Sequence, residues 1–205
     1  MNTAMIGAIH AALCGALLVT TIAAMPTRQN ARSAKAVFAA GCFWCVESDF
    51  AEIPGVIATT SGYAGGKEKD PTYEQVSAGR TGHAESLEVV YDPARVSYEQ
   101  LLDFYWHHVD PFTADRQFCD VGSQYRPIIF YQNDQEQRLA EESKARIEAR
   151  FKQPVAVQVA PFTTFYKAEE YHQDFYEKNS VRYCAYRAGC GRDRRLEQIW
   201  GKAGR

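Results

Sequence analysis

A cysteine at the junction between a strand-like run and a helical pattern constrains the fold of this chain most. It belongs to the sequence Gly41-Cys42-Phe43-Trp44-Cys45. Residues 36–40 form a short apolar run that is typical of a buried strand. Apolar side chains then recur at helical spacing, and Pro54-Gly55 ends that pattern. The sequence therefore predicts that a strand gives way to a helix at Cys42.

This position makes the Cys42 thiol a candidate nucleophile. A helix N-terminus offers unpaired backbone N–H groups and the positive end of the helix dipole, and both favour a thiolate over a thiol. Cys42 and Cys45 also form a C-x-x-C pair, which is typical of a thioredoxin-like redox centre or of half a zinc site. Cys184 and Cys190 would form the other half, but the five residues between them exceed the usual spacing of zinc ligands.

The length of 205 residues suits a single domain, which we place over residues 36–205. Residues 1–27 contain no Asp, Glu, Lys or Arg and are mostly apolar. This composition predicts a targeting segment, with a linker over residues 28–35 and export to the periplasm or another location outside the cytoplasm. Two alternatives stay open: an uncleaved membrane anchor, and a misassigned start site that leaves the protein cytoplasmic.

Charge and cysteine count narrow the function classes. The formal net charge of −2 indicates no basic surface, so we expect no nucleic-acid partner. Five cysteines follow the targeting segment, namely Cys42, Cys45, Cys119, Cys184 and Cys190. An odd number fits poorly with a purely structural set of disulfides, so at least one thiol is predicted to be reactive.

Periodic patterns divide the rest of the chain. Further strands are predicted over residues 56–63, 87–91, 127–131 and 155–159, and further helices over residues 97–108, 134–149 and 169–177. Ser97 and Gln100 match a capping box. Residues 62–82 are expected to form a functional loop, and the tail over residues 180–205 to be largely irregular. This order predicts an α+β fold, a two-layer α/β sandwich with a mixed sheet and a ferredoxin-like core.

Several motifs then occur in order between residues 36 and 180. They are Gly41-Cys42-Phe43-Trp44, Ser61-Gly62-Tyr63-Ala64-Gly65-Gly66, Pro71-Thr72-Tyr73, Gly79-Arg80-Thr81-Gly82-His83-Ala84-Glu85 and Asp120-Val121-Gly122-Ser123-Gln124-Tyr125-Arg126. Together they resemble the peptide methionine sulfoxide reductases of the A type. The resemblance implies a reductase of the S epimer of methionine sulfoxide, free or in proteins, with no metal or organic cofactor.

The resemblance also implies a role for each matching side chain. Cys42 attacks the sulfoxide sulfur, and Glu85 protonates the sulfoxide oxygen. The spacing of Glu85 in the sequence does not by itself distinguish an ordinary surface carboxylate from a proton donor. The implied substrate-binding residues are Phe43 and Trp44 around the methyl group, Tyr73 and Tyr125 at the oxygen, and Asp120 in the same pocket. A sulfoxide oxygen leaves only when protonated, so a thiolate and a neutral carboxylic acid form the required pair.

Attack would leave Cys42 as a sulfenic acid, which a second thiol condenses to a disulfide. The resemblance places the resolving and recycling thiols at Cys184 and Cys190. Cys45 ranks lower, because the first helical turn holds it in the same element as Cys42, and Cys119 is a further thiol beside the pocket. An external dithiol such as thioredoxin would regenerate the enzyme, which we expect to be a monomer. The rival predictions are a thiol–disulfide oxidoreductase that uses Cys42 and Cys45, and a zinc-binding structural module.

Overall fold

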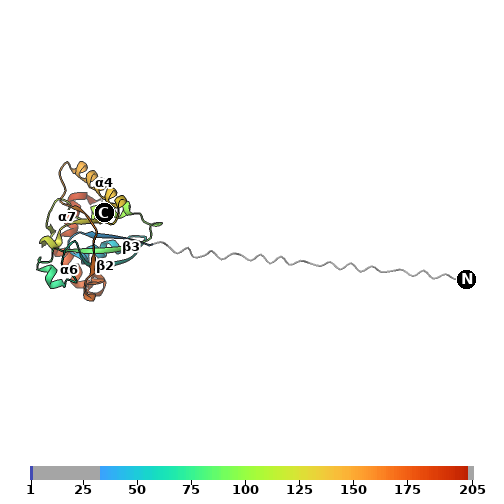
Figure 1. The fold of residues 1–205 in the computed structure, drawn as a ribbon, viewed down its shortest axis with the longest axis horizontal. Helices are drawn as coiled ribbons and strands as arrows, with labels where there is room; N and C mark the ends of the chain where they lie inside the picture. Colours follow the sequence, from blue (N-terminus) through green and yellow to red (C-terminus); the bar gives the residue numbers. More distant parts are fainter. Residues whose placement is uncertain (2–32, 203–205) are drawn as a thin grey trace. The chain divides into compact units, whose positions relative to one another are not determined.

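A six-stranded mixed sheet forms the centre of the fold in the computed structural model, which describes Met1 and residues 33–202. Its strands are β1 (Ala34–Ala39), β2 (Val56–Ala64), β3 (Ala84–Tyr91), β6 (Ile128–Tyr131), β7 (Gln158–Pro161) and β8 (Phe165–Lys167). They follow the order β7-β6-β1-β3-β2-β8. Neighbouring strands are antiparallel except β6 and β7, which are parallel. Figure 1 shows β2 and β3 side by side within the sheet.

The remaining elements connect these strands and follow the last of them. The helices are α1 (Phe43–Ala51), α2 (Tyr73–Ser77), α3 (Tyr98–His107), α4 (Asp134–Phe151), α5 (Phe175–Lys178), α6 (Ser180–Cys190) and α7 (Arg192–Trp200). Two short 3-10 turns are η1 (Ser123–Tyr125) and η2 (Glu170–His172). The strands β4 (Arg116–Gln117) and β5 (Asp120–Val121) pair as a small hairpin, with Cys119 in its turn.

The main hydrophobic core lies between one face of the sheet and the helices. Alternate residues of β3, Leu87 and Val89, point into this core, as a half-buried strand requires. They meet apolar side chains of α3, including Leu101 and Trp106, which are almost fully buried. Ser97 caps α3 in a reciprocal capping box with Gln100, so that prediction is confirmed. The α+β class and the mixed sheet are confirmed as well, whereas the ferredoxin-like label stays a prediction.

Several predicted boundaries are wrong. Strand β1 begins at Ala34, inside the predicted linker, and β3 begins at Ala84, three residues before the predicted strand, so it includes Glu85. The predicted loop over residues 62–82 contains the end of β2 and the short helix α2. The strand predicted over residues 155–159 is β7, which begins three residues later and ends two residues later. The helix predicted over residues 169–177 is divided into η2 and α5, because Asp174 adopts a left-handed φ of 52°.

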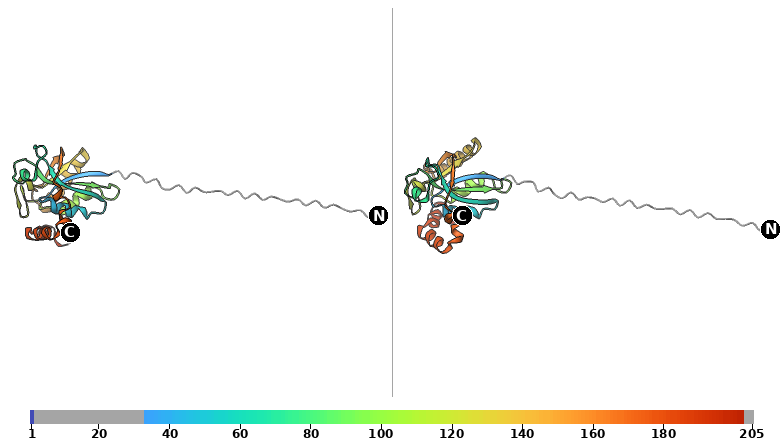
Figure 2. Two further views of the ribbon diagram at one scale, coloured as in Figure 1. Left: turned by 90° about the horizontal axis from the view of Figure 1, so that it is seen from below. Right: turned by 60° about the horizontal axis from the view of Figure 1, so that its bottom comes forward.

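The prediction of an irregular C-terminal tail is also wrong. Residues 180–200 form α6 and α7, separated by Gly191 at a left-handed φ of 71°. Tyr183, Tyr186, Arg187 and Cys190 recur along α6 at helical spacing. Figure 2 shows these two helices, in orange and red, grouped together at one side of the molecule. Within residues 33–202, no helix is long and apolar enough to cross a membrane. Beyond Met1, the predicted targeting segment over residues 1–27 lies outside the described residues.

Buried ion pairs attach the two C-terminal helices to α1. Arg187 of α6 donates to Asp49 of α1 at 2.7 Å, and Arg192 of α7 lies 3.3 Å from the same carboxylate. The Arg192 guanidinium also donates to the backbone oxygens of Ala40 and His108, at 3.2 Å and 2.6 Å. Only 1 % of Arg192 is exposed. Charged groups that stay buried need such partners, so this network fixes the C-terminal helices beside the strand–helix junction.

We expect Arg192→Ala to lower the free energy of unfolding by about 3–5 kcal/mol, because it leaves buried carbonyl groups and part of the Asp49 charge without a partner. Arg194→Ala is a matched control in the same helix, and its exposed side chain should matter by less than about 0.5 kcal/mol. Urea unfolding without added reductant measures both values. A loss below about 1 kcal/mol for Arg192→Ala would show that the network contributes little to stability.

Candidate active site

The strand–helix junction places Cys42 as predicted. Cys42 is the N-cap residue of α1, and its backbone oxygen accepts hydrogen bonds from the N–H groups of Cys45 and Val46 at 3.1 Å and 3.3 Å. Gly41 before it has a φ of 83°, which favours glycine. A Cβ at Gly41 would lie 2.5 Å from the Cβ of Gln117, so glycine is also required by the close approach of that side chain.

Glu85 approaches the same junction from β3. Its Oε2 accepts a hydrogen bond from the backbone N–H of Phe43 at 3.1 Å, which ties the carboxyl group to the first turn of α1. The side chain is buried, and burial raises the pKa of Glu85 to about 8, although the Phe43 hydrogen bond opposes this shift. Glu85 is therefore a neutral carboxylic acid at pH 7, which is the protonation state that a proton donor needs.

Aromatic side chains form a wall beside these two groups. Phe43 is buried, and its ring centroid lies 4.9 Å from that of His172. The Trp44 indole N–H donates to Nδ1 of His172 at 3.0 Å, and its ring stacks on Phe175 at 3.7 Å. These contacts come from η2 and α5, so the segment after the last sheet strand fixes the orientation of the indole. The wall is apolar and rigid, as a site for a methyl thioether group requires.

Two tyrosines enter the site from outside the sheet. Tyr73 begins α2, where its backbone N–H donates to Glu169 at 2.8 Å, and Tyr125 ends η1. Burial raises the pKa of Tyr73 to about 12, with a further contribution from the charge of Glu85. Burial also raises the pKa of Tyr125. Both phenols therefore keep their protons at neutral pH and can donate hydrogen bonds to an oxygen in the pocket.

All seven side chains predicted for catalysis and substrate binding line one pocket. Its volume is about 70 Å³, and it is lined by Cys42, Phe43, Trp44, Tyr73, Glu85, Asp120, Tyr125 and Tyr186. This space corresponds to roughly two water molecules at ~30 Å³ each. It suits the end of a side chain, such as a sulfur atom with one oxygen and one methyl group, and excludes a large ligand.

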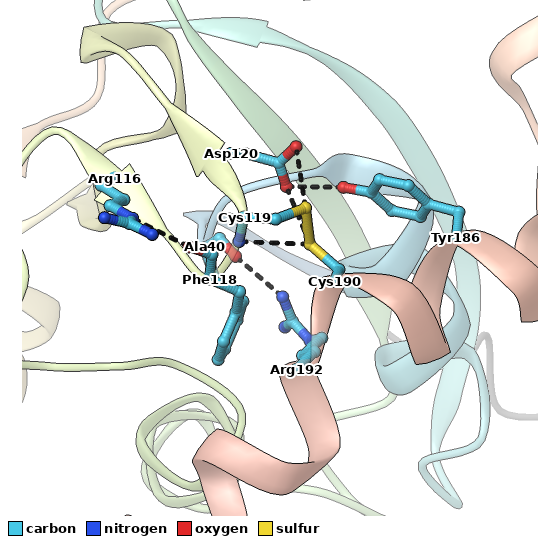
Figure 3. Close-up of a disulfide and its surroundings, with 8 residues drawn as sticks. All are labelled: Ala40, Arg116, Phe118, Cys119, Asp120, Tyr186, Cys190 and Arg192. Carbon is cyan, nitrogen blue, oxygen red and sulfur yellow. Dashed lines mark hydrogen bonds between the residues drawn. A yellow bond between two sulfur atoms is a disulfide. The ribbon is translucent and has the colours of Figure 1, made fainter.

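Tyr186 is the pocket residue that the sequence predictions missed. It lies on α6, and its hydroxyl donates to Oδ2 of Asp120 at 2.5 Å, as Figure 3 shows. Its ring meets Trp44 edge to face at a centroid distance of 5.8 Å. The prediction of an irregular tail gave no position for the Tyr186 side chain. The helical spacing of Tyr183, Tyr186 and Cys190 was the available signal.

Burial acts against the thiolate that the helix N-terminus favours. The Cys42 side chain is buried, and burial raises the pKa of Cys42 well above its usual value, with further contributions from Cys45 and Glu85. Loss of solvation disfavours the charged form of a thiol, so the resting thiolate stays a prediction. The hydrogen bond from Cys42, together with the charges of Arg192 and Arg187, lowers the pKa of Cys45 against the opposing effect of burial.

The other three cysteines are arranged unexpectedly. Cys119 and Cys190 form a disulfide across a sequence separation of 71 residues. Figure 3 shows this bond beside Asp120, whose two carboxylate oxygens lie 3.8 Å from the two sulfur atoms. Cys184 is free and exposed on α6. Cys190 is therefore held by a partner that we did not predict, and Cys184 lies on an exposed face of its helix.

The cysteines do not group as a zinc module would require. Among residues 33–202, the set of three or more potential metal-ligating side chains within 4.8 Å of one another is Cys119, Asp120 and Cys190, and two of these form the disulfide. Cys42 and Cys45 belong to the active-site pair instead. Of the four thiols of the rival zinc site, Cys190 is bonded to Cys119 and Cys184 is free and exposed, so they do not form one site with Cys42 and Cys45.

Comparisons with known proteins agree with this geometry. The family model for peptide methionine sulfoxide reductase matches residues 34–204. A relative from Listeria innocua, named peptide methionine sulfoxide reductase MsrA, is 47% identical over 168 residues, which cover 81% of this chain and 95% of the relative. The MsrA of Bacillus licheniformis is 46% identical over 169 residues, which cover 82% of this chain and 93% of the relative.

Solved structures give the same result. The reduced form of Mxr1 from Saccharomyces cerevisiae matches with a TM-score of 0.70 and 32% identity, over 74% of this chain and 88% of that protein. Methionine sulfoxide reductase A of Corynebacterium diphtheriae matches with a TM-score of 0.66 and 32% identity, over 75% of this chain and 78% of that protein. With its pocket of cysteine, glutamate and aromatic residues, this chain belongs to the peptide methionine sulfoxide reductase family.

Proposed function

We propose that this protein reduces methionine sulfoxide, free or within proteins, to methionine, and that it acts on the S epimer. The observation that carries the proposal is the meeting of Cys42 with a neutral Glu85 in one small aromatic pocket. The likeness to the A-type reductases supports the choice of epimer. The substrate methyl group packs against Phe43 and Trp44, while Tyr73 and Tyr125 donate hydrogen bonds to the sulfoxide oxygen.

The chemistry follows from the two protonation states. Glu85 transfers its proton to the sulfoxide oxygen as the Cys42 sulfur forms a bond to the sulfoxide sulfur, and the S–O bond of the substrate then breaks to release hydroxide. The hydroxide adds to the Cys42 sulfur, and the bond between the two sulfur atoms breaks with its electron pair on the substrate sulfur. The thiol proton of Cys42 returns to the Glu85 carboxylate. The substrate sulfur is reduced to the thioether, and Cys42 is oxidised to a sulfenic acid. Glu85 begins and ends the step protonated, so its raised pKa suits a group that gives up a proton and takes one back in each turnover.

We further propose that Cys45 resolves the sulfenic acid, in place of the Cys184 and Cys190 pair that the sequence favoured. Cys45 lies one turn along the same helix, where its backbone N–H donates to the Cys42 backbone oxygen at 3.1 Å, and its lowered pKa favours loss of the thiol proton. The attack forms the Cys42–Cys45 disulfide and releases water. Cys190 is already bonded to Cys119, and Cys184 is exposed. An external dithiol such as thioredoxin then returns the pair to two thiols, so the cycle needs no metal or organic cofactor.

Turnover of the separated S and R epimers tests the reductase proposal directly. The full chain is supplied with dithiothreitol, and methionine is quantified for each epimer. We expect methionine from the S epimer alone. Equal reduction of both epimers would contradict the stereochemical part. No reduction of either, together with reduction of a test disulfide, would favour the rival thiol–disulfide oxidoreductase.

A further inference from the structure

A second cavity borders the Cys119–Cys190 disulfide. Its volume is about 390 Å³, and it shares no lining residue with the active-site pocket. The residues that carry the argument are Arg116, Phe118, Cys190, Arg194 and Arg195, with Asp110. The cavity is several times larger than the active-site pocket and is large enough for a molecule the size of a short peptide.

The lining of this cavity is positively charged. Its lining includes three arginines, Arg116, Arg194 and Arg195, and one carboxylate residue, Asp110. Asp110 is buried and already accepts hydrogen bonds from Arg195 at 2.7 Å and from the N–H of Phe112 at 3.0 Å. Its charge is therefore compensated within the protein, and the exposed Arg116 and Arg194 leave the cavity attractive to an anion.

The start of α7 adds to this attraction. Gly191, the N-cap residue of this nine-residue helix, lines the cavity directly after Cys190. The first backbone N–H groups of a helix lack intrahelical partners, and the helix dipole is positive at this end. An anion in the cavity would thus lie beside a helix N-terminus, two exposed arginines and a disulfide sulfur at once.

The disulfide itself is accessible. Cys119 is exposed in the turn of the β4–β5 hairpin, and Cys190 is partly buried at the cavity wall. Figure 3 shows the S–S bond spanning from this hairpin to the end of α6. Buried structural disulfides resist thiols because no nucleophile reaches them, whereas Cys190 borders the cavity. Asp120, whose carboxylate lies 3.8 Å from both sulfur atoms, lines the active-site pocket and not this cavity.

We propose that this cavity binds a small carboxylate-bearing thiol, which reduces the Cys119–Cys190 disulfide by attack on Cys190. The carboxylate contacts the arginines while the thiolate sulfur forms a bond to Cys190, and the Cys119 sulfur leaves as a thiolate that takes a proton from solvent. A second molecule of the thiol attacks the mixed disulfide, which releases Cys190 as a thiol and the oxidised small molecule as its disulfide. Two thiols are oxidised and one protein disulfide is reduced.

This inference goes beyond the proposed reductase function, because it requires no sulfoxide. Reduction of the Cys119–Cys190 disulfide would nevertheless change the surroundings of an active-site residue. Asp120 lies against both sulfur atoms of the disulfide and also lines the active-site pocket, where Tyr186 donates to it. Opening the bond places two thiols beside that carboxylate.

Three thiols of similar size and different charge test the proposal. The full chain, with this disulfide formed, is treated at low ionic strength with 3-mercaptopropionate, 2-mercaptoethanol or cysteamine. Peptide mapping by mass spectrometry follows the loss of the Cys119–Cys190 bond and the adduct on Cys190. Rates are compared per thiolate, because the three thiols ionise to different extents. We expect the anionic thiol to react roughly tenfold faster than the neutral one, and the cationic thiol slowest.

Arg194→Glu provides the matched variant, and Arg138→Glu on the exposed surface of α4 provides the same charge change elsewhere. Arg194→Glu should remove the preference for the anionic thiol while leaving the rate with 2-mercaptoethanol unchanged, and Arg138→Glu should change neither. The preference should also disappear in 1 M salt, where the Debye length is about 3 Å. Equal rates per thiolate for all three thiols, an unchanged preference in Arg194→Glu, or an adduct on Cys119 would overturn the proposal.

Discussion

Cys42→Ser is expected to abolish methionine formation from the sulfoxide, whereas Cys45→Ser should retain the first chemical step. The serine hydroxyl is a far weaker nucleophile than sulfur and stays protonated in the buried pocket. Cys45 lies one helical turn further along α1 and does not line the pocket. Rapid-quench measurement of methionine after mixing reduced enzyme with sulfoxide should show a burst near one equivalent per chain for wild type and for Cys45→Ser.

The oxidised products distinguish the two roles. In the wild type, mass spectrometry after one turnover should find Cys42 linked to Cys45. In Cys45→Ser, dimedone should label Cys42 as a sulfenic acid, because the neighbouring thiol is missing. A link between Cys42 and Cys184 in the wild type would contradict the resolving role of Cys45. A burst that persists in Cys42→Ser would contradict the nucleophile assignment itself.

Glu85→Gln is expected to lower the turnover rate at pH 7 by about 10²–10⁴-fold, the usual contribution of a positioned general acid. The amide has nearly the same shape and can still accept the hydrogen bond from the Phe43 N–H, but it cannot give a proton to the departing oxygen. Because the pKa of Glu85 is raised to about 8, the acid is protonated below that pH and loses its proton above it. The wild-type rate should therefore fall about tenfold for each pH unit above 8.

Glu47→Gln is the matched control for this measurement. Glu47 is another buried glutamate, on α1, and burial raises its pKa to about 7, but it does not line the active-site pocket. Its variant should keep the fall in rate above pH 8, and Glu85→Gln should lose it. If Glu85→Gln worked at the wild-type rate at pH 7, another group would have to supply the proton.

Seven of the eight pocket residues could be predicted from the sequence because they belong to short motifs of consecutive residues. The turn from strand to helix at Cys42 follows from periodicity and from Pro54-Gly55, both of which are local signals. The environment of each group could not be predicted in the same way. The raised pKa of Cys42 depends on burial by segments far away in the chain, and a helix terminus seen in isolation suggests the opposite shift.

The C-terminal tail, residues 180–205, shows a second reason why local sequence patterns did not predict the structure. Its sequence is polar and arginine-rich, and α6 depends on contacts with residues far away in the chain. Arg187 pairs with Asp49, 138 residues apart, and Tyr183 packs in one cluster with Cys45. The same holds for Cys119 and Cys190, which meet only because the β4–β5 hairpin lies beside the end of α6. Pairing partners at such separations depend on the completed fold, not on spacing.

The order of the pocket residues along the chain has a consequence for biosynthesis. Synthesis runs from the N-terminus, so Cys42 is made before Tyr186 and the buried Arg192. A ribosome-bound chain that has not yet released α6 and α7 lacks one wall of the pocket and the cation that lies beside Asp49. During that interval the catalytic thiol is less shielded from solvent than in the finished protein. The pocket is thus complete, and its thiol fully enclosed, only after α6 and α7 have left the ribosome and folded.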